Sequence, residues 1–562
     1  MEKLKRKAFQ NLKKASVSAT VAVVALSGFG ATATYASAEE DPMSLYLDAQ
    51  KNTNEVQWER YKPYTETSYE LQDRLLEEAY ESNSTIQAGL DVNSDMIHQM
   101  VPKLSMYEKA LSKAKLETSS KLDPSTNEMF ADMDLYLDRY RIGQGSFYQN
   151  EEKTSVKITN LYNKYFTVNN DDFGNLMEMS GANAEMPATP EGQMSAAAPE
   201  MTKIPNVVEY NQTTFTMDEL KQIGQDYLDI LEEQVKEADF SLEENASFED
   251  ETYNKVSVKI DEENAQEMIK KLLEELKNDE RIWDTVMTQM EMQGVPTEGQ
   301  EEMMIADLNK AIENVDKLQL QDGINIEAYI KDNLVAHEEI TFSILNPETD
   351  QTVSVEMVGN YKENGDDYQA SGDISIVSEA ADTDVVLSYT EDGEEVSNGL
   401  NVDNTFRLKV DAPETQSDLN VGLDLTSEYT ETSSNVAFDV ILDGEALQGQ
   451  MIPDISGHVN TTLNKESDDS YSQDMEFGLD LAMTTPQTGE MNGSLTFDVQ
   501  QDVQFTDELT FPEVTEGENA VDMTNASDEE MAEIGEKVQR NMKRYADVFK
   551  SVFANTLFDE QK

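Results

Sequence analysis

The chain has no cysteine among its 562 residues, only three histidines and two tryptophans, and 42 basic against 113 acidic side chains. The absence of cysteine excludes disulfides, thiolate metal or redox sites and a lipidated cysteine at a mature N-terminus. The formal net charge of −71 is spread along the chain and repels nucleic acids and anionic surfaces. We therefore expect no nucleic-acid partner, and we expect stability to rest on a hydrophobic core, which this length permits.

Residues 1–38 have the three-part pattern of a secretory signal peptide. A basic start precedes a short apolar stretch over 17–31, and residues 36–38 (Ala-Ser-Ala) offer a small-x-small cleavage site. The mature chain would begin at Glu39 as a secreted or extracytoplasmic protein, with no membrane span after cleavage. The alternative is an uncleaved anchor, although the apolar stretch is short against the roughly 20 residues of a spanning helix.

Metal binding is weakly indicated at two places. Residues 169–174 (Asn-Asn-Asp-Asp-Phe-Gly) come nearest to a calcium loop, but Phe173 stands where an oxygen ligand is needed. Methionines at 177–205 could suit Cu(I), but their irregular spacing without histidine favours a linker. The acidity itself fits either solubility in a saline or alkaline exterior or a distributed sink for divalent cations. We predict no metal site and no cofactor.

Repeated prolines and glycines over 179–210 predict a linker between a smaller unit, 41–178, and a larger unit, 211–562. Both units place helices before strands. In the smaller unit, apolar spacing predicts a helix over 68–80. Strands are expected to follow it at three places, which are residues 86–92, residues 133–137 and a hairpin around residue 150.

The larger unit opens with signals for several amphipathic helices. Thr216 and Glu219 form a capping box, and Asp261 is a suitable N-cap for the helix that follows the strand at 256–260. Helical periodicity resumes over 280–292 and 305–315. Each of these helices has an apolar stripe that must pack on something.

Residues 340–503 alternate apolar and polar side chains in one run after another. Turn signals separate the runs at Asn364-Gly365, Asp392-Gly393 and Asp443-Gly444. Such a pattern predicts one large antiparallel sheet with an apolar face and an acidic, solvated face.

A long C-terminal helix is predicted over 527–557. Ser527 and Glu530 have the spacing of a second capping box, and apolar residues then recur every three or four positions. We expect this helix to pack on the open face of the long sheet. A partner-binding or membrane-surface helix is the alternative, which the negative charge disfavours on anionic lipids.

No catalytic motif is recognisable. His98, His337 and His458 are isolated in the sequence, and there is no zinc-binding His-Glu-x-x-His, no Gly-x-Ser-x-Gly elbow and no phosphate-binding glycine loop. Paired carboxylates for glycoside hydrolysis would be hidden among the 113 acids. We predict a protein that is not an enzyme and name no catalytic residue.

The order of helices before a broad antiparallel meander resembles the half-barrel of periplasmic lipoprotein carriers and related lipid-binding domains. Residues 157–166 and 505–514 are also similar to an uncharacterised family of secreted proteins of Gram-positive bacteria. The resemblance implies an α+β fold in two units, with helices packed on one face of large, half-barrel-like antiparallel sheets. It also implies acyl chains held between sheet and helices, although the missing lipidation cysteine departs from many relatives.

The expected function is binding of a hydrophobic ligand, such as a lipid, or of an envelope protein between sheet and helices, without catalysis. Alternatives are an acidic surface scaffold or stress protein with a filled core, and a secreted hydrolase. The candidate ligand-lining or core-lining residues are Phe406, Leu408, Leu423, Phe438, Phe477, Phe497, Tyr545 and Phe549.

Overall fold

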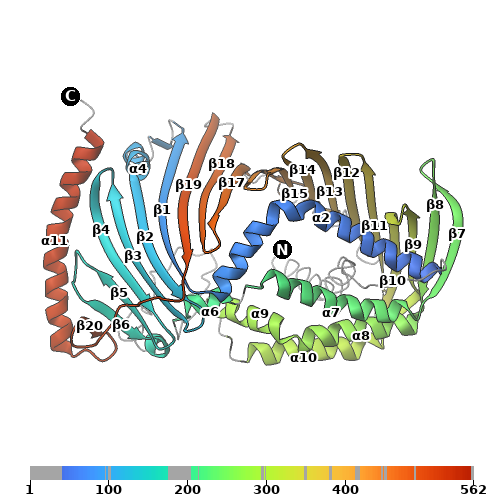
Figure 1. Ribbon diagram of the computed structural model, residues 1–562, viewed down its shortest axis with the longest axis horizontal. Helices are drawn as coiled ribbons and strands as arrows, with labels where there is room; N and C mark the ends of the chain where they lie inside the picture. Colours follow the sequence, from blue (N-terminus) through green and yellow to red (C-terminus); the bar gives the residue numbers. More distant parts are fainter. Residues whose placement is uncertain are drawn as a thin grey trace.

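The computed structural model describes residues 41–558 apart from 95–96, 99–100, 102, 175–203, 213, 293–296, 298, 347–350, 379–382, 412–417, 445–446, 448–451 and 486–488. The predicted signal peptide and most of the predicted linker lie outside the described residues. Within them, one 20-stranded sheet carries helices on its surface (Figure 1).

The strands are β1 (Tyr80–Asn93), β2 (Ala114–Asp123), β3 (Glu128–Leu137), β4 (Tyr140–Gln149), β5 (Lys153–Ile158), β6 (Tyr165–Asn169), β7 (Asp239–Phe248), β8 (Glu251–Ile260), β9 (Gln319–Lys331), β10 (Leu334–Asn346), β11 (Gln351–Asn364), β12 (Asp367–Ser378), β13 (Thr383–Val396), β14 (Gly399–Asp411), β15 (Leu419–Tyr429), β16 (Ser433–Asp443), β17 (Asp454–Ser467), β18 (Ser470–Thr485), β19 (Gly489–Phe505) and β20 (Ala520–Asp522). The helices are α2 (Pro42–Glu77), α4 (Leu104–Leu111), α6 (Val207–Gln212), α7 (Met217–Val235), α8 (Glu262–Asn278), α9 (Glu280–Met292), α10 (Gln300–Val315) and α11 (Asp528–Phe558), with a 3-10 turn at Asn170–Asp172.

The order of the strands in space differs from their order in the chain. Strands β7 to β19 follow one another as an antiparallel meander, and β1 then pairs along β19 from Tyr80↔Phe505 to Asn93↔Asn492. Strands β2 to β6 continue from β1, and β20 pairs with β6 in parallel. The expectation of two units, each with its own sheet, is therefore wrong. Residues 41–178 and 211–562 build a single sheet, because β1 pairs on one edge with β2 and on the other with β19.

The best-covered part of the sheet lies at its β7–β12 end. There α2, α7 and α8 lie against the apolar face (Figure 1). Helix α8 contributes Ala265, Met268 and Leu272, which pack with strand residues such as Ile326 and Ile340 in one buried cluster. Helices α9 and α10 form an outer layer on α8, in which Trp283 is buried and donates its indole N–H to the Leu276 carbonyl at 2.9 Å. The amphipathic stripes predicted for this region are thus accounted for by packing.

The predicted helix starts are confirmed at atomic level. In α7 the Thr216 hydroxyl accepts from the Glu219 amide at 3.2 Å, and the Glu219 carboxylate accepts from the Thr216 amide at 2.9 Å. Asp261 caps α8 through the Asn264 amide at 2.9 Å. At the start of α11, the Glu530 amide donates to the Ser527 hydroxyl at 3.3 Å. Local sequence determines these helix boundaries because the caps satisfy amides that have no partner inside the helix.

Three local predictions need correction. The helix expected over 68–80 is only the end of α2, which begins at Pro42 and continues through Pro63. Residues 207–210, at the end of the predicted linker, belong to α6 (Val207–Gln212). Asp392-Gly393 is not a turn but lies inside β13, because the Tyr368 ring packs directly over the glycine.

The C-terminal helix lies elsewhere than expected. Helix α11 stands beside β4 and β3 at the edge of the molecule (Figure 1), where it also contacts α4, rather than over the long meander. Asn541 donates to the Leu161 carbonyl at 2.9 Å, and the Tyr545 hydroxyl donates to the Ile142 carbonyl. These bonds fix α11 to the strands contributed by the N-terminal part of the chain. The long meander is left without this cover.

Candidate functional site

The apolar face of the sheet continues beyond the part that the helices cover. Register places Ile374 of β12, at the margin of the covered core, opposite Leu387 of β13, and Leu387 opposite Leu408 of β14. A neighbouring row crosses six strands without a polar side chain between its ends. Its members are Tyr389, Phe406, Leu423, Val440, Ile455 and Leu481.

Further rows extend the apolar surface to β19. We call the apolar strip the set Leu387, Tyr389, Phe406, Leu408, Val421, Leu423, Phe438, Val440, Leu442, Ile455, Val459, Phe477, Leu479, Leu481, Leu495 and Phe497. Leu387 keeps 43% of its surface exposed, Leu481 42% and Phe406 38%. Strand spacing of about 4.8 Å gives the strip a length of about 29 Å from β13 to β19. Large exposed apolar patches are uncommon on soluble monomers and mark interaction sites.

Glycines let aromatic rings lie flat on this face. A Cβ added at Gly457 would come within 2.5 Å of the Phe438 ring, and one at Gly393 within 1.9 Å of the Tyr368 ring. Both positions therefore need glycine for close approach rather than for a special backbone angle. The rings fill the space above the backbone and make the surface continuous.

The opposite face of the same strands is polar and acidic. Arg407 pairs with Asp424 at 2.6 Å, and His458 contacts Glu476 at 3.0 Å. The Thr426 hydroxyl donates to Asp403 at 2.9 Å. Because side chains alternate between faces, each strand of the strip presents its charges on the side away from the apolar rows.

Helix α2 crosses the apolar face and forms one border of the strip. Its residues Val56, Tyr61 and Tyr64 pack on a buried cluster at the strand ends, which contains Leu400 and Val402. Further along, Leu71 packs against Tyr471, Val503 and Phe505. The helix thus covers the ends of these strands and leaves their other half open.

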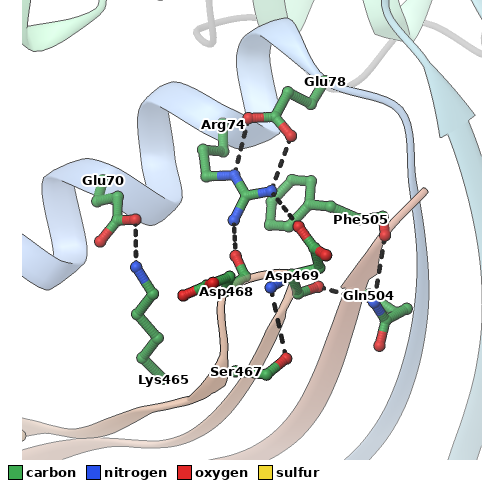
Figure 2. A network of polar contacts seen from close by, with 9 residues as sticks. All are labelled: Glu70, Arg74, Glu78, Lys465, Ser467, Asp468, Asp469, Gln504 and Phe505. Carbon is green, nitrogen blue, oxygen red and sulfur yellow. Dashed lines mark hydrogen bonds and ion pairs between the residues drawn. The ribbon is translucent and has the colours of Figure 1, made fainter. Parts of the chain in front are cut away.

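A polar network fixes the C-terminal end of α2 to the sheet (Figure 2). Arg74 donates from Nε and Nη2 to the Glu78 carboxylate, each at 2.8 Å, and also bonds the Asp468 carbonyl. Its guanidinium lies 4.0 Å from the centre of the Phe505 ring, a cation–π distance. Lys465 reaches Glu70 from the sheet side at 2.5 Å. The contacts hold the helix across the turn between β17 and β18.

Near the middle of α2, a carboxylate on the apolar face accepts hydrogen bonds from tyrosine hydroxyls. The hydroxyls of Tyr61 and Tyr368 donate to Glu391 Oε1 at 2.7 Å and 2.6 Å, and Tyr389 donates to Glu391 Oε2. Burial and the neighbouring carboxylate raise the pKa of Tyr61 and Tyr368 well above the usual range. Their hydroxyls are therefore protonated donors at neutral pH.

A second carboxylate lies deeper, under the first turns of α2. Glu338 of β10 accepts from the hydroxyl of the fully buried Tyr46 at 2.8 Å and from the Gln50 amide at 2.5 Å. Burial raises the pKa of Glu338 to about 7, although both hydrogen bonds oppose the increase. Loss of solvation therefore outweighs hydrogen bonding at this position.

Six of the eight predicted lining residues come together on the apolar strip; these are Phe406, Leu408, Leu423, Phe438, Phe477 and Phe497. Tyr545 and Phe549 do not join them. They lie on α11 with their rings 6.3 Å apart, and Tyr545 bonds β4. Glu391 and its tyrosines were not predicted, because alternation identifies the face of a strand but not which helix lies beside it.

The predicted motifs for metal binding and catalysis are used in other ways. Asn169 accepts from the Asp171 amide at 3.0 Å, and the buried Asn170 donates to the Asn150 carbonyl at 2.9 Å. These two side chains of the calcium-like loop thus form local hydrogen bonds to the backbone. Among the described residues, no three His, Asp or Glu side chains are grouped so that they could hold a metal ion. The methionine tract at 177–205 falls almost entirely outside the described residues.

None of the helices in the described ranges is long and apolar enough to cross a membrane. No protein-family model matches the sequence, and no curated protein matches it. Similar solved structures include OmpT, an outer membrane protein of Vibrio cholerae, with 7% identity, a TM-score of 0.19 and coverage of 75% of this chain and 98% of that one. Another is OccK5 of Pseudomonas aeruginosa, with 7% identity, a TM-score of 0.22 and coverage of 76% and 98%. TM-scores this low do not establish a common fold, so function is argued from the site.

Proposed function

We propose that this protein binds an elongated apolar ligand, such as the acyl chain of a lipid, along the apolar strip. The single observation that supports the proposal most is the row from Tyr389 to Leu481, which lies beside the row that leaves the helix-covered core at Ile374 and remains partly open to solvent. Burying such side chains is favourable by about 25 cal/mol for each Å² of apolar surface. A filled-core scaffold would instead have this face packed.

We also propose that the protein works outside the cytoplasmic membrane and without catalysis. The leader-like residues 1–38 support an extracytoplasmic location. The contacts of two histidines support a structural rather than a catalytic role for them. His98 contacts Glu108 at 3.3 Å and His337 contacts Asn360 at 2.7 Å, and the two pairs lie in different parts of the molecule. A secreted hydrolase is the alternative, and turnover of peptides, esters or peptidoglycan by the purified chain would establish it.

The test of ligand binding uses the mature chain, purified without detergent. A neutral alkyl alcohol such as 1-dodecanol is titrated into it, and its binding is measured by the displacement of a neutral fluorescent probe. We expect saturable binding. Leu387→Ser and Phe406→Ser should each weaken it about fivefold, because about 1 kcal/mol of ligand contact is lost. Val377→Ser is the matched control, since Val377 is 37% exposed on the opposite, polar face.

The outcomes separate the alternatives clearly. Binding that is absent, or that weakens equally in the Val377→Ser control, would refute a site on the strip. Native mass spectrometry of the same material gives an independent reading, because a co-purified lipid supports the carrier and its absence together with no dodecanol binding favours the scaffold.

A further inference from the structure

The border between the apolar strip and α2 contains a carboxylate that faces the strip. Glu391 lies on the same face of β13 as Leu387 and Tyr389, four and two residues away respectively, and it remains partly exposed. Across the ladder it stands opposite Ala370 and Asn404. It is therefore an anionic group at the edge of an otherwise apolar surface.

The contacts of Glu391 are neutral. Three tyrosine hydroxyls donate to it, from Tyr61, Tyr368 and Tyr389, and together they fix the carboxylate in place. Hydrogen bonds to an ionised acceptor are the stronger kind. The guanidinium of Arg60 is nearby, stacked 4.0 Å from the centre of the Tyr368 ring. Its hydrogen bonds go instead to Glu363 at 2.9 Å, Glu395 at 3.0 Å and the Tyr361 hydroxyl at 2.9 Å.

Aromatic rings lie on the strip side of this carboxylate. The rings of Tyr389 and Phe406 are 5.0 Å apart, and Phe406 is exposed. The negative faces of such rings attract ammonium groups, and rings combined with a carboxylate are a recurrent arrangement for binding them. Since the chain has a formal net charge of −71, it also repels anionic head groups and attracts cationic ones.

We infer that the ligand of the strip is a cationic amphiphile, whose ammonium head group binds between Glu391 and the rings of Tyr389 and Phe406 while its apolar tail lies along the strip. The inference rests on the proposed function and specifies its ligand class. It adds a charge requirement that the apolar rows alone do not impose.

The test compares three probes with the same tail: dodecylammonium and dodecanoate, each below its micelle concentration, and 1-dodecanol below its solubility limit. We expect dodecylammonium to bind at least tenfold more tightly than dodecanoate and more tightly than the alcohol. Glu391→Gln should weaken dodecylammonium binding about fivefold to tenfold and leave dodecanol binding unchanged. The control is Glu394→Gln, which removes the same charge from the opposite face of β13 and should change neither affinity by more than twofold.

Because Glu391 accepts hydrogen bonds from three hydroxyls, its replacement can also affect folding. Tyr389→Leu keeps the carboxylate and removes one ring, and it should weaken dodecylammonium binding about threefold more than dodecanol binding. Thermal unfolding of each variant reports whether the fold is retained.

Failure of the inference can be told apart from failure of the proposed function. If dodecanol does not bind, the apolar site itself is refuted. If dodecanol binds and the ammonium probe has no advantage, or if Glu394→Gln removes that advantage equally, only the head-group assignment falls. A cationic amphipathic peptide that binds where dodecylammonium does not would overturn the assignment in favour of a peptide partner.

Discussion

Replacing Glu338 with glutamine should stabilise the protein in alkaline solution. The pKa of this carboxyl is raised from 4.5 to about 7 in the folded chain, so the folded state binds more protons than the unfolded state between these values. Its stability contribution is fully present below about pH 4.5 and is lost as the pH rises through about 7. One pKa unit corresponds to about 1.4 kcal/mol, which gives a ceiling of about 3 kcal/mol.

The expected gain is smaller than this ceiling, about 1–2 kcal/mol at pH 8, because the side chain keeps some contact with solvent. A glutamine oxygen can still accept from the Tyr46 hydroxyl and the Gln50 amide, so the hydrogen bonds need not be lost. The assay is denaturant unfolding of the mature chain and the Glu338→Gln variant at pH 5 and pH 8. We expect the full gain at pH 8 and only a small part of it at pH 5, where the carboxyl is already partly ionised in the unfolded chain but not in the folded one.

The general effect of removing one negative charge is measured by Glu339→Gln. Glu339 is the next residue of β10 and faces the other side of the sheet, opposite Glu327 of β9. Equal gains from Glu338→Gln and Glu339→Gln would show that net charge alone is responsible. A Glu338→Gln variant less stable than the parent at pH 8 would refute the argument that desolvation dominates.

Two further predictions concern the contacts of α2 and the close approach of rings to the sheet. Gly393→Ala should lower the free energy of unfolding by about 2 kcal/mol, measured with denaturant, because the added Cβ would meet the Tyr368 ring. Gly359→Ala is the control: no atom lies within 4 Å of the added carbon, so the free energy of unfolding should change by less than about 1 kcal/mol. Arg74→Met should lower the free energy of unfolding by about 1 kcal/mol at low salt, because the ion pairs with Glu78 and Asp469 are lost. Lys62→Met, which breaks an exposed pair with Glu59, should leave the free energy of unfolding almost unchanged. Equal effects of the two substitutions would contradict the role of the network.

The sequence predicts elements and faces well where the signal is local. The capping residues Thr216 and Asp261 determine helix starts, and period-two alternation identifies the side chains that share the apolar face of β11 to β19, including Phe406 and Phe497. Both signals depend on neighbours a few residues away. Those parts of the fold and of the site that depend on a single helix or strand could therefore be predicted from the sequence.

Long-range arrangement was not predictable in the same way. Tyr80 pairs with Phe505, and no local pattern indicates that these two strands meet, so two units were expected where one sheet exists. Helix α2 was also underestimated, because Pro63 and many polar residues obscure its period, while tertiary bonds from Tyr46, Tyr61 and Arg74 hold it to the sheet. Glu391 became a candidate only once α2 was placed beside β13, since its tyrosine partners come from α2, β12 and β13.

The distribution of charge opposes self-association through the open apolar strip. Acids such as Asp403, Asp424 and Glu476 alternate along the same strands with the apolar residues, and so they lie on the face opposite the strip. Their mutual repulsion opposes contact between two copies of the chain, which the strip alone would favour. Helix α2 covers the ends of these strands through the clusters around Leu400 and Tyr471 and leaves the rows beyond them open. Burial of the surface that the described helices leave uncovered remains available to a ligand, which is the condition that the proposed binding requires.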